Sequence, residues 1–219
     1  MTASAVAMAS RAEHVQRIVT PGGLTAWLVE SYAVPLVAVE FALRGGAAQD
    51  PADKPGVAAL LAGTIDEGAG PYDARSFHHA IEDHAIHLGF GADRDSFSGH
   101  MQTLSRHLDK AFELLKLALT DARLDAVDVA RIRSQFAAEL KRDLNDPDAM
   151  AAKAFREAAF PNHPYGRPVR GALDSVDSLT REDLIALRER LFATKDLKIA
   201  VVGAIDAQTL SAKLDDVFG

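Results

Sequence analysis

Residues 86–102 (IHLGFGADRDSFSGHMQ) decide the fold. Apolar side chains recur at every second position from Ile86 to Ala92, and again after the break, where Phe97 and Met101 alternate with polar residues. A period of two is typical of a strand with one buried face. The polar turn Asp-Arg-Asp between the two runs therefore predicts an antiparallel hairpin.

The elements around this hairpin do not follow a regular βαβ alternation. Gly22 and Gly23 supply the turn of a first hairpin, and Asp146-Pro147 has the residues of a helix start. We therefore predict an α+β domain, with helices packed on one face of a mostly antiparallel sheet. The expected strands are 15–19, 24–30, 36–43 and 197–203, and the expected helices are 56–65, 74–83, 107–119, 125–144, one from 146, one from 180, and 206–218.

Composition excludes several classes of protein. The chain has 219 residues, of which 48% are hydrophobic and 25% charged, and its net charge is −7. It lacks the basic excess of a nucleic-acid-binding protein and any apolar run near the roughly 18 residues of a membrane span. The absence of cysteine excludes disulfides, thiolate zinc sites and thiol nucleophiles.

Residues 1–13 are small and unpatterned, and we expect them to be a disordered tail before a single domain at 14–219. Within this tail, Ala7-Met8-Ala9 resembles an A-x-A cleavage site. One hypothesis is that the tail is the remainder of an export signal. The protein would then be periplasmic or otherwise exported. The alternative is an alanine-rich leader on a cytoplasmic protein.

A histidine-rich segment over residues 78–84 is close to a metal-binding pattern. His79 and Asp83 are four residues apart, so on a helix they share one face. However, the run has the order His-x-x-Glu-x-His, and His84 falls where the helix is expected to end. The simpler interpretation is a polar helix face with exposed histidines.

The loop at 161–168 (PNHPYGRP) is the other candidate. Tyr165 and Arg167 are suited to anchoring a ligand, but such a loop is more often fixed by the packing of its own Pro and Tyr residues. Spacing alone therefore identifies no active site.

The whole pattern resembles the insulinase/pitrilysin family, which includes mitochondrial processing peptidase. The resemblance runs from about residue 14 to residue 219, and implies the metallohydrolase fold of the mitochondrial processing peptidase type. In that family two such domains follow each other in one chain, so this chain resembles the N-terminal half and implies a C-terminal sister domain. The similar segments are 20–30 (TPGGLTAWLVE), 44–58 (RGGAAQDPADKPGVA), 92–98 (ADRDSFS), 111–115 (AFELL), 162–168 (NHPYGRP) and 200–206 (AVVGAID).

The resemblance also implies where a metal site would lie. Active members carry His-x-x-Glu-His on a helix after the Gly-rich loop, and a later Glu completes the zinc ligands. The matching positions here are Ala59, Ala62 and Gly63, with Glu139 as the remaining acidic position. One carboxylate does not hold zinc against water, so we expect no cofactor in this chain.

The loss of these residues resembles the non-catalytic partner of the family's paired subunits. This implies a subunit that pairs with a zinc-bearing peptidase subunit and contributes to peptide binding. The family similarity places the peptide as an added strand on the strand over 86–92, where the alternative is an ordinary core strand. The residues concerned are Ile86, Leu88, Gly89, Phe90 and Gly91.

Two other functions stay open. The first is an active metallopeptidase with a displaced zinc site, built from His79, Asp83, His84 and Glu139. The second is a purely structural subunit, similar to the processing-peptidase-like core proteins of respiratory complexes.

Overall fold

The computed structural model describes residues 14–192 and 196–219, so the predicted tail at 1–13 lies outside the described residues. A six-stranded sheet has the order β1-β2-β6-β3-β5-β4. The pair β2–β6 is parallel and the other neighbours are antiparallel. The strands are β1 (Gln16–Val19), β2 (Thr25–Glu30), β3 (Leu36–Arg44), β4 (His87–Ala92), β5 (Ser96–Leu104) and β6 (Leu197–Gly203).

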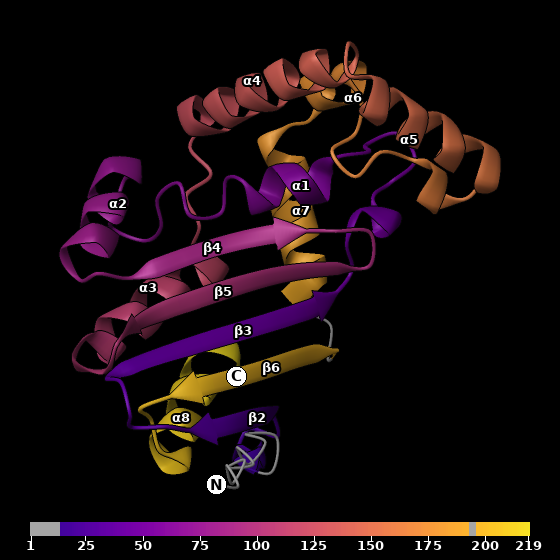
Figure 1. Ribbon diagram of the computed structural model, residues 1–219. Coiled ribbons are helices and arrows are strands. Elements are labelled where there is room, and N and C mark those ends of the chain that lie inside the picture. The colour runs from indigo at the N-terminus through magenta and orange to yellow at the C-terminus, as the bar shows by residue number, and fades with distance from the viewer. Residues whose placement is uncertain (1–13, 193–195) are drawn as a thin grey trace, which may run out of the picture.

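Helices gather behind the sheet and above its β4 edge (Figure 1). Helices α3, α7 and α8 contact β5, β3 and β1 from behind, and α1 lies beside β4. This arrangement confirms the predicted α+β class. The helices are α1 (Val57–Ala62), α2 (Ala74–Asp83), α3 (Leu108–Thr120), α4 (Ala126–Asp143), α5 (Pro147–Ala159), α6 (Leu173–Ser178), α7 (Arg181–Phe192) and α8 (Ala207–Phe218).

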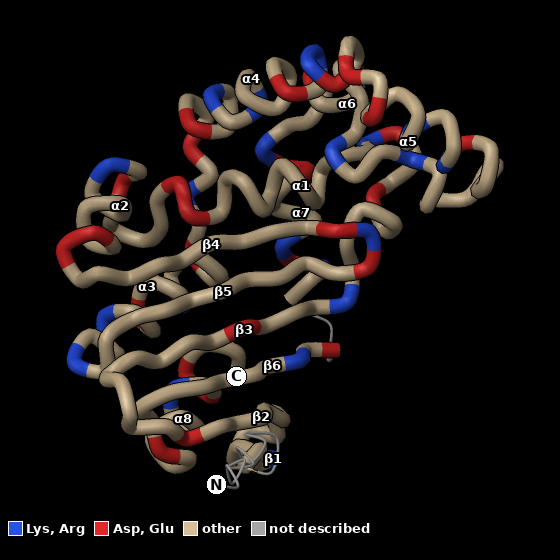
Figure 2. Tube along the Cα trace, viewed as in Figure 1, with Lys and Arg blue, Asp and Glu red and all other residues tan. Residues whose placement is uncertain are grey.

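Strand β3 shows how the sequence separates the two faces of the sheet. Val37, Val39 and Phe41 are buried toward the helices, while Glu40 between them is exposed on the opposite face. The period of two in the sequence thus defines a core face and an open face. Figure 2 shows that charged residues gather on α2, α4 and the strand ends, while the middles of the strands are mostly uncharged.

The open face has a continuous row of side chains across five strands. The register aligns Trp27, Ala200, Glu40, His100 and Gly89 from β2 to the edge strand β4. A Cβ at Gly89 would lie 2.6 Å from the imidazole Cε1 of His100. The His100 ring covers this part of β4, and a side chain at Gly89 would require that ring to move.

Two elements differ from the sequence prediction. Helix α1 covers residues 57–62 rather than 56–65, because Gly56 has φ of +98° and the chain leaves the helix at Gly63. Helix α6 was not predicted, since its sequence LDSVDS is too short and too polar to show a helical period.

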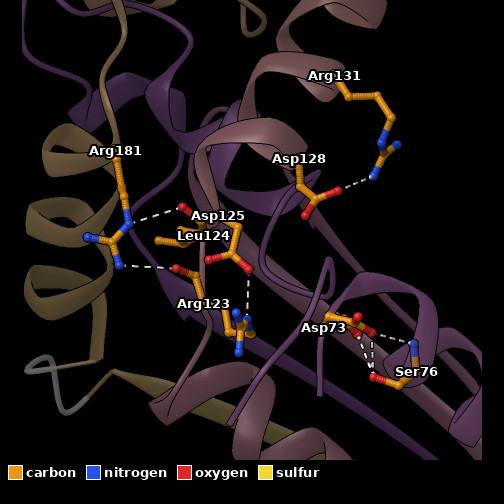
Figure 3. A network of polar contacts seen from close by, with 8 residues as sticks. All are labelled: Asp73, Ser76, Arg123, Leu124, Asp125, Asp128, Arg131 and Arg181. Carbon is orange, nitrogen blue, oxygen red and sulfur yellow. Dashed lines mark hydrogen bonds and ion pairs between the residues drawn. The ribbon is translucent and has the colours of Figure 1, made fainter. Parts of the chain in front are cut away.

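A polar network fixes the entry into α4 (Figure 3). The guanidinium of Arg181, on α7, donates hydrogen bonds to the carbonyls of Arg123 and Leu124. Leu124 has φ of +47°, and Arg123 forms an ion pair with Asp125 at 2.7 Å. These contacts hold a strained connection in place, so α4 starts at a defined position. In the described ranges 14–192 and 196–219, no helix is both long and apolar enough to span a membrane.

Candidate functional site

The start of α1 is organised by one buried carboxylate. Asp50 accepts hydrogen bonds from the backbone N–H groups of Gly56, at 2.7 Å, and Ala58, at 3.2 Å. Burial raises the pKa of Asp50 to about 6, although these two hydrogen bonds act in the opposite direction. A carboxylate at this end of a helix satisfies N–H groups that have no partner within the helix.

The loop at 161–168 supports the same region from outside. Arg167 donates hydrogen bonds to the carbonyls of Ala48, Asp50 and Pro51 at distances of 3.2–3.4 Å. Tyr165 donates its hydroxyl to Asp95 at 2.6 Å. The side chains of Tyr165 and Arg167 are therefore both engaged in holding the loop in place. This agrees with the simpler interpretation, in which the loop is fixed by its own residues, rather than with a ligand anchor.

Of the three positions that match the family's His-x-x-Glu-His motif, Gly63 lies against α4. Ala59 and Ala62 are buried. At Gly63, an added Cβ would lie 3.2 Å from Cγ2 of Ile132 and 3.4 Å from Cε1 of Phe136. The lack of a side chain at Gly63, just after α1, thus allows Ile132 and Phe136 of α4 to pack where a longer polar side chain would project.

Glu139, the remaining acidic position, is held by a cation from the chain itself. Arg170 lies 2.5 Å from Glu139 and 3.2 Å from Asp143, so one guanidinium joins two carboxylates one helical turn apart. Arg142 lies 4.0 Å from the other oxygen of Glu139. These residues do not fit zinc, because Ala59, Ala62 and Gly63 provide no ligand atom and the one carboxylate is already paired.

The histidines of α2 are not brought together with Glu139. His79 lies 3.9 Å from Glu82, and His84 contacts the carbonyl of Ala80. In the part of the chain that the structure describes, no group of three or more His, Cys, Asp or Glu residues is placed to hold a metal ion. The structure gives no support to a displaced zinc site.

The strand proposed for peptide binding lies at the edge of the sheet. Strand β4 pairs with β5, and no backbone hydrogen bond joins residues 87–92 to another described segment. Asp93 donates its N–H to the carbonyl of Ser96, so hydrogen-bonded pairs recur from there at every second residue. By this parity the N–H and C=O groups of Leu88 and Phe90 point away from β5, toward the free edge.

The five predicted peptide-binding residues differ in the face of the sheet to which they belong. Ile86 is buried just before β4, and Leu88 and Phe90 point to the core face. Gly89 and Gly91 lie on the open face. Their contact with a peptide stays a prediction.

Sequence reasoning missed two residues that define this region, Phe136 and Arg170. Phe136 lies within the helix predicted at 125–144, but its proximity to Gly63 depends on packing between distant segments. Arg170 lies two residues after the loop at 161–168, and no motif marked it.

The fold and the site together define a metallopeptidase-like domain in which the zinc-ligand positions have changed. The insulinase family model, peptidase family M16, matches residues 28–173. The chain therefore belongs to the insulinase family, which confirms the resemblance.

The similar proteins include both zinc proteases and inactive members. An uncharacterized zinc protease of Mycobacterium leprae is 26% identical, over 96% of this chain and 47% of that protein. The non-peptidase homolog YmxG of Helicobacter pylori is 22% identical, over 85% of this chain and 43% of that protein. A solved structure of a peptidase M16 inactive domain from Pseudomonas fluorescens has a TM-score of 0.88 at 24% identity, and the match covers 93% of this chain and 50% of that one. The chain thus spans about half the length of these proteins.

Proposed function

We propose that this chain is a non-catalytic subunit that pairs with a zinc-bearing subunit of the same family to form a peptide-degrading or peptide-processing endopeptidase. The observation that carries the proposal is the contact of Gly63 with Phe136, together with the pairing of Glu139 with Arg170. The site is packed and charge-neutralised without a metal. Zinc then belongs to the partner, and this chain contributes a surface for peptide.

The edge strand β4 supports the peptide-binding part of the proposal. Its outward N–H and C=O groups offer hydrogen bonds to any extended peptide, largely independent of side-chain identity. Such binding suits a subunit that presents many sequences to a catalytic partner.

We also propose a C-terminal sister domain that covers the open face of the sheet. The relatives are about twice as long as this chain. Apolar side chains remain exposed on this face, with Trp27 at 39% and Val202 at 47%. Exposed apolar surface of this kind indicates an interface.

The test is reconstitution with a family member from the same organism that carries His-x-x-Glu-His. Hydrolysis of an unstructured peptide is measured with each chain alone and with the mixture, and zinc is measured in each chain by elemental analysis. We expect chelator-sensitive hydrolysis in the mixture and zinc in the partner. A partner variant with Gln in place of the motif's Glu serves as the control, and its mixture should be inactive.

Other outcomes point to other functions. A partner that is fully active alone would refute the proposal. A stable complex in which this chain leaves hydrolysis unchanged would indicate a structural subunit. Stoichiometric zinc in this chain, with hydrolysis by the chain alone, would indicate a displaced site.

A further inference from the structure

The open face of the edge strand β4 carries few side chains of its own. Residues 87–92 alternate between the two faces of the sheet, and the open-face positions after His87 are Gly89 and Gly91. Strand β4 is the uppermost strand of the sheet in Figure 1, where the helices lie behind and this face is turned toward the viewer. The backbone of two alternate residues therefore lacks side chains at the free edge.

Side chains from the neighbouring strand β5 reach over both glycines, but to different extents. The imidazole of His100 lies over Gly89, where its Cε1 and Nε2 atoms are 2.6 and 2.9 Å from the position that a Cβ would take. At Gly91 the nearest such atom is the Oγ of Ser98, at 3.5 Å. The His100 ring thus extends from β5 across β4 toward the free edge.

The imidazole of His100 is available for contact with a bound peptide. His100 is exposed, and within residues 14–192 and 196–219 it forms no hydrogen bond, ion pair or ring contact with another side chain. Glu40 is its cross-strand neighbour on β3, and Asp66 interacts with it electrostatically. These two carboxylates disfavour an acidic peptide side chain at this position, because like charges repel.

An antiparallel strand added to β4 would place one peptide side chain beside this ring. Gly89 forms a hydrogen-bonded pair with His100 on the β5 side, so it faces a peptide residue across a pair without hydrogen bonds. Side chains come closer in such pairs, with Cβ atoms about 4.5–5.5 Å apart. Because Gly89 has no side chain, the peptide side chain meets the His100 ring in its place.

We infer that His100 is a specificity-determining residue, which selects a peptide with an aromatic side chain opposite Gly89. An aromatic ring on the added strand covers the backbone of the edge glycine, as aromatic residues beside glycine do in sheets. The same ring packs against the imidazole, and such ring pairs stabilise beyond the area that they bury. This inference rests on the proposed function and names the substrate class for the same edge strand.

The proposed sister domain does not compete for this position. The exposed apolar residues that support it are Trp27 and Val202, on β2 and β6. Strands β3 and β5 separate β6 from β4 in the sheet. A peptide along the free edge therefore leaves the β2–β6 half of the open face to that domain.

The test measures binding to this chain alone by fluorescence anisotropy. The probe is a short labelled peptide of Ser and Thr with one central Phe, capped at both ends. The comparison peptide carries cyclohexylalanine in place of Phe, which has the same shape and is apolar but not aromatic. A third peptide carries Lys at this position. We expect the Phe peptide to bind about fivefold tighter than the cyclohexylalanine peptide, because only the aromatic ring forms a ring pair with the imidazole.

Variants of β5 identify the source of that preference. His100→Ala should reduce the fivefold ratio to about one, while His100→Phe should retain it, because the variant again offers a ring. A merely structural role of His100 would change the affinities for both peptides and leave their ratio unchanged. Gln102→Ala is the matched control, because Gln102 is exposed on the same face of β5, two residues further along. Thermal unfolding of each variant checks that the fold is retained.

Several results would overturn the inference. These are equal binding of the Phe and cyclohexylalanine peptides, tightest binding of the Lys peptide, no binding of any of the three, or a ratio that His100→Ala leaves unchanged. The assay needs neither partner nor hydrolysis. If partner-dependent hydrolysis occurs and the isolated chain has no preference for Phe, the inference about His100 fails alone. A preference that depends on His100, without any partner-dependent hydrolysis, contradicts the proposed function alone.

Discussion

Gly63 lies against the aromatic ring of Phe136, where an added Cβ would be 3.4 Å from Cε1. Active members of the family carry the second histidine of the motif at the position matching Gly63. The space that an imidazole needs is therefore taken up by α4. In this chain the small residue at the motif position and the packing of α4 beside it therefore depend on each other.

We therefore predict that the missing histidine is not tolerated at this site. Gly63→His should lower the free energy of unfolding by about 1–3 kcal/mol, the usual cost of overpacking. Phe136→Ala in the same chain should recover part of the loss, because it removes the ring that the imidazole meets. Urea denaturation measures both effects.

A matched control introduces the same side chain on the outside of α4. Ala138 is exposed, so Ala138→His should change stability by less than about 0.5 kcal/mol. If Gly63→His is as mild as this control, the packing argument is wrong.

Arg167 gives a second prediction, on the loop that supports α1. Its guanidinium donates to three backbone carbonyls of residues 48–51. Arg167→Met should cost about 1–3 kcal/mol, because the part-buried carbonyls of Ala48 and Asp50 lose a charged donor. Arg75→Met provides the comparison, since Arg75 is exposed on α2, and thermal unfolding of the two variants is compared. Equal melting temperatures would show that the loop holds without Arg167.

The sequence predicted the elements far better than the contacts between them. The hairpin at 86–102 was predicted correctly because alternation is a local signal, and the loop at 161–168 stood out through its own composition. Helix α6 was missed because a six-residue segment with only two apolar residues carries no periodic signal. The α+β class then followed from the order of the elements.

The sequence predicted where the candidate site lies, but not which side chains contact one another there. The resemblance to the family identified the motif positions, because a substituted motif can be found from the sequence alone. These positions are Ala59, Ala62, Gly63 and Glu139. The pair Arg170–Glu139 joins residues 31 apart in the chain, and no rule of spacing links them. That Glu139 is paired rather than free was visible in the structure alone.

Along β4, the backbone N–H and C=O groups of alternate residues point toward β5 and toward the free edge. This alternation predicts how a peptide binds. Because Leu88 and Phe90 direct their backbone groups outward, an added peptide strand should donate through every second N–H. N-methylation of alternate residues of a labelled peptide should weaken binding by about tenfold. Methylation of the intervening residues should have little effect, and anisotropy measures both series. If the two series weaken binding equally, the peptide does not bind as an added strand.

Trp27, the one tryptophan of the chain, reports on the open face of the sheet. It is 39% exposed and lies beside Ala200 of β6. Addition of the sister domain should shift its emission to shorter wavelengths and reduce quenching by acrylamide. Tyr32 is 64% exposed beyond the end of β2, so Tyr32→Trp in a Trp27→Phe chain is the control. Unchanged emission from Trp27 would show that the domain packs elsewhere.

The last prediction concerns pH, and it rests on two aspartates that cap helices. Burial raises the pKa of Asp50 from 3.8 to about 6, so the folded state binds this proton more tightly than the unfolded chain does. Its contribution to stability is full below pH 3.8 and is lost as the pH rises through about 6. The free energy of unfolding of the wild type, minus that of Asp50→Asn, should therefore fall between about pH 4 and pH 6.

Asp73 provides a control of opposite sign. Hydrogen bonds from the hydroxyl and N–H of Ser76 lower its pKa below 3.8, so its contribution is present above that pH and is lost as the pH falls. The corresponding difference for Asp73→Asn should stay constant between about pH 5 and pH 7 and shrink below pH 4. Urea denaturation at a series of pH values measures both differences. If the Asp50 difference does not decrease with rising pH, the carboxylate is not held in a buried, proton-favouring site at the start of α1.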